Sequence, residues 1–298
     1  MTFSAPGKAR TGFFTYNVKT LPGFYVERKN FGPIFTYYVK NGGDFYVLRK
    51  TFRRAAFSLV ELLVTVAAIG LLAAILVPAL PAAKAAADAA VCRSNLRQLA
   101  AANLAYAADH GRYVAAAADI DGANSIRWHG VRDGKAFDGA KGPLAPYLGG
   151  GGASAWVRRC PGFHPDAAGF ETSCGGYGYN ALGVGSELCR PDGGGATVGM
   201  PAGAVAHPAA TVMFADTAYL QGSGKKAKLI EYSFAEPPQL VGGIAAWPTI
   251  HFRHRGRANV AWADGHVTSE TLARTGSRGA AQGLGWFGPD DNSLFDPF

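Results

Sequence analysis

An uncharged apolar run early in the chain constrains the fold more than any other feature. Residues 62–83 contain no charged side chain and consist mainly of Leu, Val, Ile and Ala. A helix of about 20 apolar residues is long enough to cross the roughly 30 Å hydrocarbon layer of a membrane. We therefore predict a transmembrane helix over residues 57–83.

A single carboxylate, that of Glu61, lies at the start of this run. A charged side chain inside lipid costs about 2.5–3.5 kcal/mol on insertion scales, so an isolated acid suggests a functional role. Ser58 and Glu61 also fit the S/T-x-x-E capping box, in which the carboxylate only caps the helix. Both interpretations stay open at this point.

Basic side chains directly precede the run and predict its orientation. Such clusters remain on the cytoplasmic side of a membrane. We therefore expect a single-pass protein with a cytoplasmic N-terminus and a periplasmic or extracellular C-terminal head. The cluster consists of Arg49, Lys50, Arg53 and Arg54.

Residues 57–80, FSLVELLVTVAAIGLLAAILVPAL, resemble the type IV prepilins and type II secretion pseudopilins. The resemblance implies that a prepilin peptidase cleaves between Ala56 and Phe57 and methylates the Phe57 amine. It also implies that Glu61 meets this amine while subunits assemble into a filament in the inner membrane. Ala56 stands where the family nearly always has Gly, so we expect slow cleavage, with the absence of cleavage as the less favoured alternative.

Residues 1–56 are expected to form the leader, and they contain a tandem repeat. The segment 14–29 recurs as 35–50, with ten identities in sixteen positions. Aromatic and β-branched residues around turn signals predict two β-hairpins. The preferred alternative is a non-coding duplication that is translated because the start is misassigned, in which case residues 1–46 are absent from the cellular protein.

The net charge of +8 resides in this leader. Residues 1–56 hold ten Lys/Arg and two Asp/Glu, which leaves 19 of each sign in residues 57–298. A neutral mature chain carries no basic surface of the kind that binds nucleic acid. We expect its partners to be the peptidase and other pilin or pseudopilin subunits.

Beyond the membrane, residues 84–110 predict an amphipathic stem helix that continues the first one. Gly111 is expected to end it, and Pro78 to bend it. Residues 111–298 are rich in Gly and turns, with short apolar runs at 210–216 and 258–264 that predict antiparallel strands. The fold class is therefore α+β, a long helix packed on a loop-rich sheet. The expected apolar face of the stem comprises Val91, Leu96, Leu99, Asn103 and Tyr106.

The segment RHRGRANVAWADGHV resembles the prepilin-associated H-X9-DG family through His254, Asp264 and Gly265. Asp264-Gly265 between apolar stretches predicts a hairpin turn, and the basic segment 253–257 is expected to be a solvated loop. No metal-ligand spacing is present. We therefore expect His254 to bond a loop backbone or Asp264, and we expect no cofactor. Calcium remains an alternative, because related pseudopilins contain calcium sites.

The cysteines, Cys92, Cys160, Cys174 and Cys189, all follow the membrane segment, on the side where disulfides persist. Four cysteines allow three full pairings, and the sequence does not choose among them. The preferred hypothesis pairs Cys92 with Cys160 and Cys174 with Cys189. A zinc site is the less favoured alternative.

Two functions are compatible with these features. The first is a structural pilin or pseudopilin subunit. The alternative is a membrane-tethered module that binds carbohydrate through the loop 121–135, with Trp128 and His129 as stacking residues, although a core role for Trp128 is preferred. We expect no enzyme, because no nucleophile–base pair or carboxylate pair has a recognisable spacing.

Overall fold

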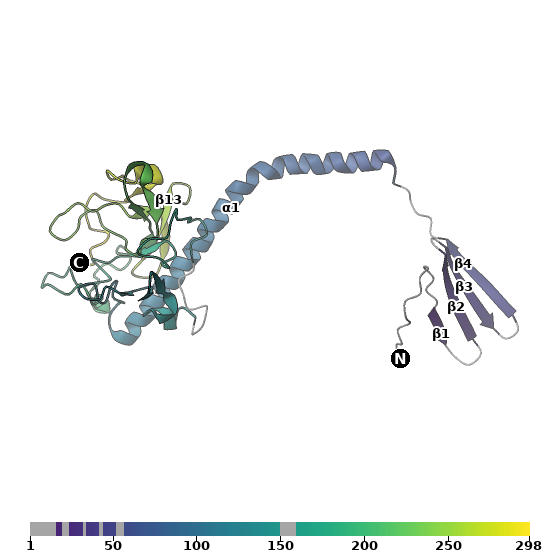
Figure 1. Ribbon diagram of the computed structural model, residues 1–298, viewed down its shortest axis with the longest axis horizontal. Helices are drawn as coiled ribbons and strands as arrows, with labels where there is room; N and C mark the ends of the chain where they lie inside the picture. Colours follow the sequence, from purple (N-terminus) through teal and green to yellow (C-terminus); the bar gives the residue numbers. More distant parts are fainter. Residues whose placement is uncertain (1–15, 20–23, 32–33, 42–43, 52–56, 150–158) are drawn as a thin grey trace. The chain divides into compact units, whose positions relative to one another are not determined.

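The computed structural model describes residues 16–19, 24–31, 34–41, 44–51, 57–149 and 159–298, and before residue 57 it describes the backbone alone. The chain divides into two units, Met1–Leu76 and Val77–Phe298. Helix and antiparallel sheet are both present (Figure 1), so the predicted α+β class holds at this level.

The strands before residue 57 form one antiparallel sheet in the order β1-β2-β3-β4. The first copy of the repeat supplies β1 (Tyr16–Lys19) and β2 (Phe24–Phe31), and the second supplies β3 (Ile34–Asn41) and β4 (Asp44–Thr51). Each copy thus forms the predicted hairpin. The position of the true start stays a prediction.

The helix α1 runs from Leu59 to His110, 52 residues, or about 78 Å at 1.5 Å per residue. It continues through Pro78 and Pro81, so the prolines do not end it, and the bend at Pro78 stays a prediction. Gly111 follows with φ +71°, and its amide donates to the Ala107 carbonyl at 2.8 Å. The predicted C-terminal stop is confirmed.

The N-terminal part of α1 is exposed among the described residues. Its most apolar 18-residue window has a mean hydropathy of 2.6 and contains no buried residue. Among the described residues, α1 is the one helix long and apolar enough to cross a membrane. A helix that is apolar on every side requires lipid or other apolar helices around it.

The C-terminal part of α1 packs against the head. Val91 is 48% exposed, so its predicted place on the apolar face is wrong, and Tyr106 is half-buried. The buried face begins at Cys92 instead, and Leu96, Leu99 and Asn103 follow it at spacings of four, three and four residues. Its members are Cys92, Asn95, Leu96, Leu99, Ala100, Ala102, Asn103 and Ala107.

The main sheet of the head is antiparallel with the strand order β14-β13-β9-β8. Its strands are β8 (Tyr177–Tyr179), β9 (Val212–Asp216), β13 (Arg257–Trp262) and β14 (Val267–Thr271). All five residues of β9 are buried. Both apolar runs that predicted strands are strands, and β13 and β14 form the predicted hairpin.

Smaller sheets and single helical turns complete the head. One sheet has the order β5-β6-β7, and the pairs β10-β11 and β12-β15 form the others. Their bounds are β5 Ile126–Arg127, β6 Gly130–Asp133, β7 Ala136–Asp138, β10 Tyr219–Gln221, β11 Lys228–Ile230, β12 Ile250–His251 and β15 Leu284–Gly285. The 3₁₀ turns are Gly139–Lys141, Ala145–Tyr147, Ala202–Ala204, Gly224–Lys226 and Ala280–Gln282.

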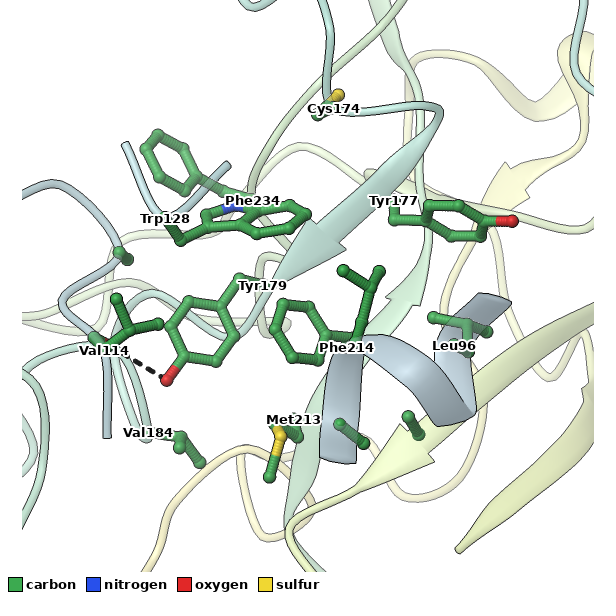
Figure 2. Close-up of a cluster of buried hydrophobic side chains, with 14 of the residues drawn as sticks. Leu96, Val114, Trp128, Cys174, Tyr177, Tyr179, Val184, Met213, Phe214 and Phe234 are labelled. Carbon is green, nitrogen blue, oxygen red and sulfur yellow. Dashed lines mark hydrogen bonds between the residues drawn. The ribbon is translucent and has the colours of Figure 1, made fainter. Parts of the chain in front are cut away.

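Buried aromatic rings join the stem to the main sheet (Figure 2). Phe214 stacks on Tyr179 with ring centres 4.6 Å apart, and Trp128 meets Phe214 edge-on at 5.0 Å. The Tyr179 hydroxyl accepts a hydrogen bond from Asn103 Nδ2 at 2.9 Å. It donates to the Val114 carbonyl at 3.1 Å (Figure 2). A polar residue of the stem is thereby satisfied inside the core, where an unpaired amide would cost about 1–3 kcal/mol.

Candidate functional site

The start of α1 carries the capping box that the sequence offered as one interpretation of Glu61. The Ser58 amide donates to Glu61 Oε2 at 2.8 Å, and the Glu61 amide donates to Ser58 Oγ at 3.1 Å. Capping is therefore confirmed, and an additional role for Glu61 in assembly stays a prediction. Phe57 is 75% exposed, whereas Ala56, on the other side of the predicted cleavage point, lies outside the described residues.

The residues of the H-X9-DG motif lie at opposite ends of β13. His254 precedes this six-residue strand and Asp264 follows it, a distance of about 20 Å at 3.3 Å per residue. The bond to Asp264, one of the two alternatives expected for His254, is therefore wrong. Asp264 Oδ1 instead accepts hydrogen bonds from the amide of His266 at 3.0 Å and from its Nδ1 at 2.6 Å. Partial burial opposes ionisation of Asp264, but these two bonds outweigh it and lower its pKa.

Gly265 occupies the turn between β13 and β14 with φ +92°. Glycine adopts this conformation without the penalty that a Cβ brings. A Cβ at this position would also lie 3.1 Å from Leu104 Cδ1 on the stem. The DG half of the motif therefore forms a tight turn that packs closely on α1.

His254 belongs to a buried polar cluster that includes a disulfide. Its Nε2 lies 3.4 Å from Cys160 Sγ and 3.3 Å from Asp216 Oδ2. Cys160 is bonded to Cys92 at an S–S distance of 2.09 Å, across a sequence separation of 68 residues. The predicted Cys92–Cys160 pair is confirmed, and it ties the stem to the head. Each of Cys92, Cys160, Asp216 and His254 offers one atom that could bind a metal, and these four atoms all lie within 4.8 Å of one another.

Asp216, the last residue of β9, is fully buried at the centre of this cluster. Its Oδ1 accepts a hydrogen bond from Arg253 Nη2 at 2.7 Å, and its Oδ2 accepts one from the backbone amide of Asn259 at 2.7 Å. Burial raises the pKa of Asp216, but Arg253, His254 and the Asn259 amide more than offset this effect, so the pKa lies below its ordinary value. The carboxylate is therefore ionised in the protein interior.

Arg253 connects the cluster to the surrounding backbone. Its side chain is only 3% exposed and that of His254 is 4% exposed, so the prediction of a solvated loop is wrong at these two residues. Its guanidinium donates to the carbonyls of Gly176 at 2.6 Å and Thr217 at 3.2 Å, and its Nε donates to Cys160 Sγ at 3.4 Å. Sequence reasoning missed both Arg253 and Asp216. The one available signal was Asp216 itself, a charged residue at the end of the predicted strand 210–216, whose other residues do not alternate between apolar and polar.

A cavity of about 490 Å³ adjoins the cluster. His254 lines it together with Arg93 and alanines of α1, Arg255 of the turn before β13, Arg257 of β13 and Ser269 of β14. His254 thus belongs both to the buried cluster and to the wall of the cavity.

The second predicted disulfide is wrong, because Cys174 and Cys189 are both free thiols. Cys174 is fully buried within the main core, and its Sγ lies 3.5 Å from the Glu171 carbonyl. Cys189 lies on a partly exposed turn. Burial raises the pKa of both thiols, that of Cys189 to about 11. Both therefore remain protonated at neutral pH.

The loop proposed for carbohydrate binding does not present its aromatic side chain. Trp128 is fully buried and donates its indole N–H to the Ser233 carbonyl at 2.8 Å, and His129 is 2% exposed. The preferred core role of Trp128 is confirmed. Neither side chain is available to stack on a sugar.

Comparison of the chain with protein-family models, with curated proteins and with solved structures finds no match. The described residues define an α+β protein with one exposed apolar helix that meets the length and composition of a membrane span. Its head contains a buried cluster of two cysteines, a histidine and an aspartate.

Proposed function

We propose that the chain is a pilin-like subunit that is held in the inner membrane by residues 57–83 and then assembles with other subunits through this same helix. The observation that carries the proposal is the exposure of the apolar helix. Every large apolar side chain from residue 57 to residue 80 is at least 58% exposed. An apolar surface of this extent requires lipid or apolar partners. On assembly, the apolar helices of other subunits would replace the lipid around it.

Glu61 supports assembly over simple anchoring. An anchor needs only apolar residues, and a carboxylate within the span makes insertion less favourable. After cleavage before Phe57, the new amine would lie four residues from Glu61, in its own subunit or in a neighbour. Pairing with this amine would offset the cost of the carboxylate in a low-dielectric environment.

The stem supports the proposal as well. The helix that would enter the filament continues without a break into the core of the head, where the Cys92–Cys160 disulfide fixes it covalently. The main sheet and its smaller neighbours would then form the exposed head of each subunit. A type IV pilus and a type II secretion pseudopilus both fit this arrangement.

Two substitutions separate assembly from capping. Glu61→Gln retains a side chain that can complete a capping box but removes the charge. Ser58→Ala removes one capping bond, worth about 1 kcal/mol, and retains the carboxylate. The proposal expects no filaments with Glu61→Gln and normal filaments with Ser58→Ala, both variants being inserted in the membrane. Normal filaments with Glu61→Gln would overturn it.

A further inference from the structure

The buried cluster has the donor set of a zinc site. Zinc is bound in proteins by cysteine sulfur, histidine nitrogen and carboxylate oxygen, usually four in a tetrahedron. Cys92, Cys160, Asp216 and His254 offer two sulfurs, one oxygen and one nitrogen, and all four residues are buried. They come from the stem, from a loop, from the end of β9 and from the turn before β13. No short sequence motif could therefore have indicated the site.

Two of the distances within the cluster already match such a tetrahedron. With metal bonds of about 2.0–2.3 Å, neighbouring ligand atoms lie about 3.3–3.8 Å apart. His254 Nε2 is already 3.4 Å from Cys160 Sγ and 3.3 Å from Asp216 Oδ2. The two sulfurs of the disulfide are bonded to each other and so lie closer together than this range, and they would have to separate to become two ligands of one ion. Reduction of the disulfide is the change that permits this movement.

We propose that Cys92 and Cys160 have two alternative states, a disulfide and the thiolate ligands of one zinc ion that His254 and Asp216 complete. An external dithiol cleaves the S–S bond, transfers two electrons and two protons, and itself becomes a disulfide. Cys92 and Cys160 are then thiols. Zinc binding releases these two protons and forms the two Zn–S bonds.

The charges balance in both states. In the disulfide state, the Asp216 carboxylate is paired with the Arg253 guanidinium. In the zinc state, two thiolates and the carboxylate are matched by the divalent ion and the same guanidinium. Because an uncompensated charge in a protein interior is costly, a buried site that is neutral in both states can hold either.

The groups around the cluster are also those that orient metal ligands. Arg253 Nε donates to Cys160 Sγ at 3.4 Å, and the Tyr177 hydroxyl donates to Cys92 Sγ at 3.3 Å. The backbone amide of Asn259 and the Arg253 guanidinium both donate hydrogen bonds to the Asp216 carboxylate. Such outer hydrogen bonds fix ligand geometry, and their loss typically lowers metal affinity about 10–100-fold. The cavity beside His254 offers an entry path for the ion.

The test uses the full chain in detergent micelles. The protein is reduced with a phosphine, freed of metal, and titrated with zinc against a chromophoric chelator, with cobalt(II) as a spectroscopic probe of thiolate coordination. We expect one zinc per reduced chain and none in the oxidised chain. Arg253→Gln should lower the affinity about 10–100-fold. Cys189→Ser, which removes a thiol outside the cluster, should bind zinc like the wild type.

His254→Ala should abolish both zinc binding and the cobalt thiolate spectrum, and circular dichroism of its oxidised form reports whether the variant folds. The comparison of oxidised with reduced wild type requires no substitution. Three results would overturn the proposal: equal zinc binding by the oxidised protein, unchanged affinity in folded His254→Ala, or no zinc bound by the reduced wild type, whether or not it stays folded.

Discussion

Removal of the Cys92–Cys160 disulfide should destabilise the head strongly. The bond closes a loop of 68 residues between the stem and the head. In the chain-entropy model such a loop contributes about 4 kcal/mol, because the cross-link restricts the unfolded chain. A domain of ordinary stability has only about 5–15 kcal/mol in total. The double variant Cys92→Ala/Cys160→Ala should therefore lose a large share of its free energy of unfolding.

The assay is denaturant unfolding of the full chain in micelles, without reductant and with a chelator present. Near-ultraviolet circular dichroism follows the aromatic core of the head separately from the helical signal of the membrane segment. Cys189→Ala is the control, since this cysteine forms no disulfide, and it should change the stability by less than about 1 kcal/mol. A double variant within about 1 kcal/mol of the wild type would refute the reasoning.

Three further predictions concern the buried charges and the turn. Asp216→Asn should cost about 3–5 kcal/mol by urea unfolding, because it leaves the Arg253 guanidinium buried without its partner. Burial and the Arg253 charge lower the pKa of His251 to about 3, with Asp216 opposing. In the unfolded chain this histidine has a pKa near 6.5, so between about pH 6.5 and 3 it is protonated in the unfolded state and neutral in the folded state. The free energy of unfolding should therefore fall by about 1.4 kcal/mol per pH unit as the pH drops through this range. His251→Asn should flatten this slope. Gly265→Ala should cost at least about 1–2 kcal/mol in thermal unfolding because of its positive φ, whereas Gly203→Ala, with nothing within 4 Å of the added Cβ, should be nearly neutral.

The sequence predicted the elements whose causes are local. The 52-residue helix follows from an uninterrupted apolar run, a capping box at its start and a glycine at its end. The strands β9 and β13 follow from short apolar runs, and the turn between β13 and β14 follows from Asp264-Gly265. Each of these signals acts over a few residues, so it can be recognised without knowledge of the tertiary fold.

The failures concern contacts between distant segments. A bond from His254 to Asp264 was one of two alternatives for this histidine, but β13 separates the two residues, and Asp216 of β9 lies beside His254 instead. The hypothesis that pairs Cys174 with Cys189 is wrong because one lies in the core and the other on a turn. In the sequence Arg253 does not differ from the neighbouring arginines, and only the buried carboxylate of Asp216 on β9 explains its burial. Such pairings depend on which strands become neighbours, and the spacing within one segment carries no information about this.

The identity of the first residue of the protein in its native membrane tests the central claim most directly. N-terminal sequencing and intact mass of the membrane-extracted protein report the cleavage site and the methyl group together. The account predicts a chain that begins at N-methylated Phe57 and requires detergent for extraction. A freely soluble chain that still carries the residues before Phe57 would contradict it.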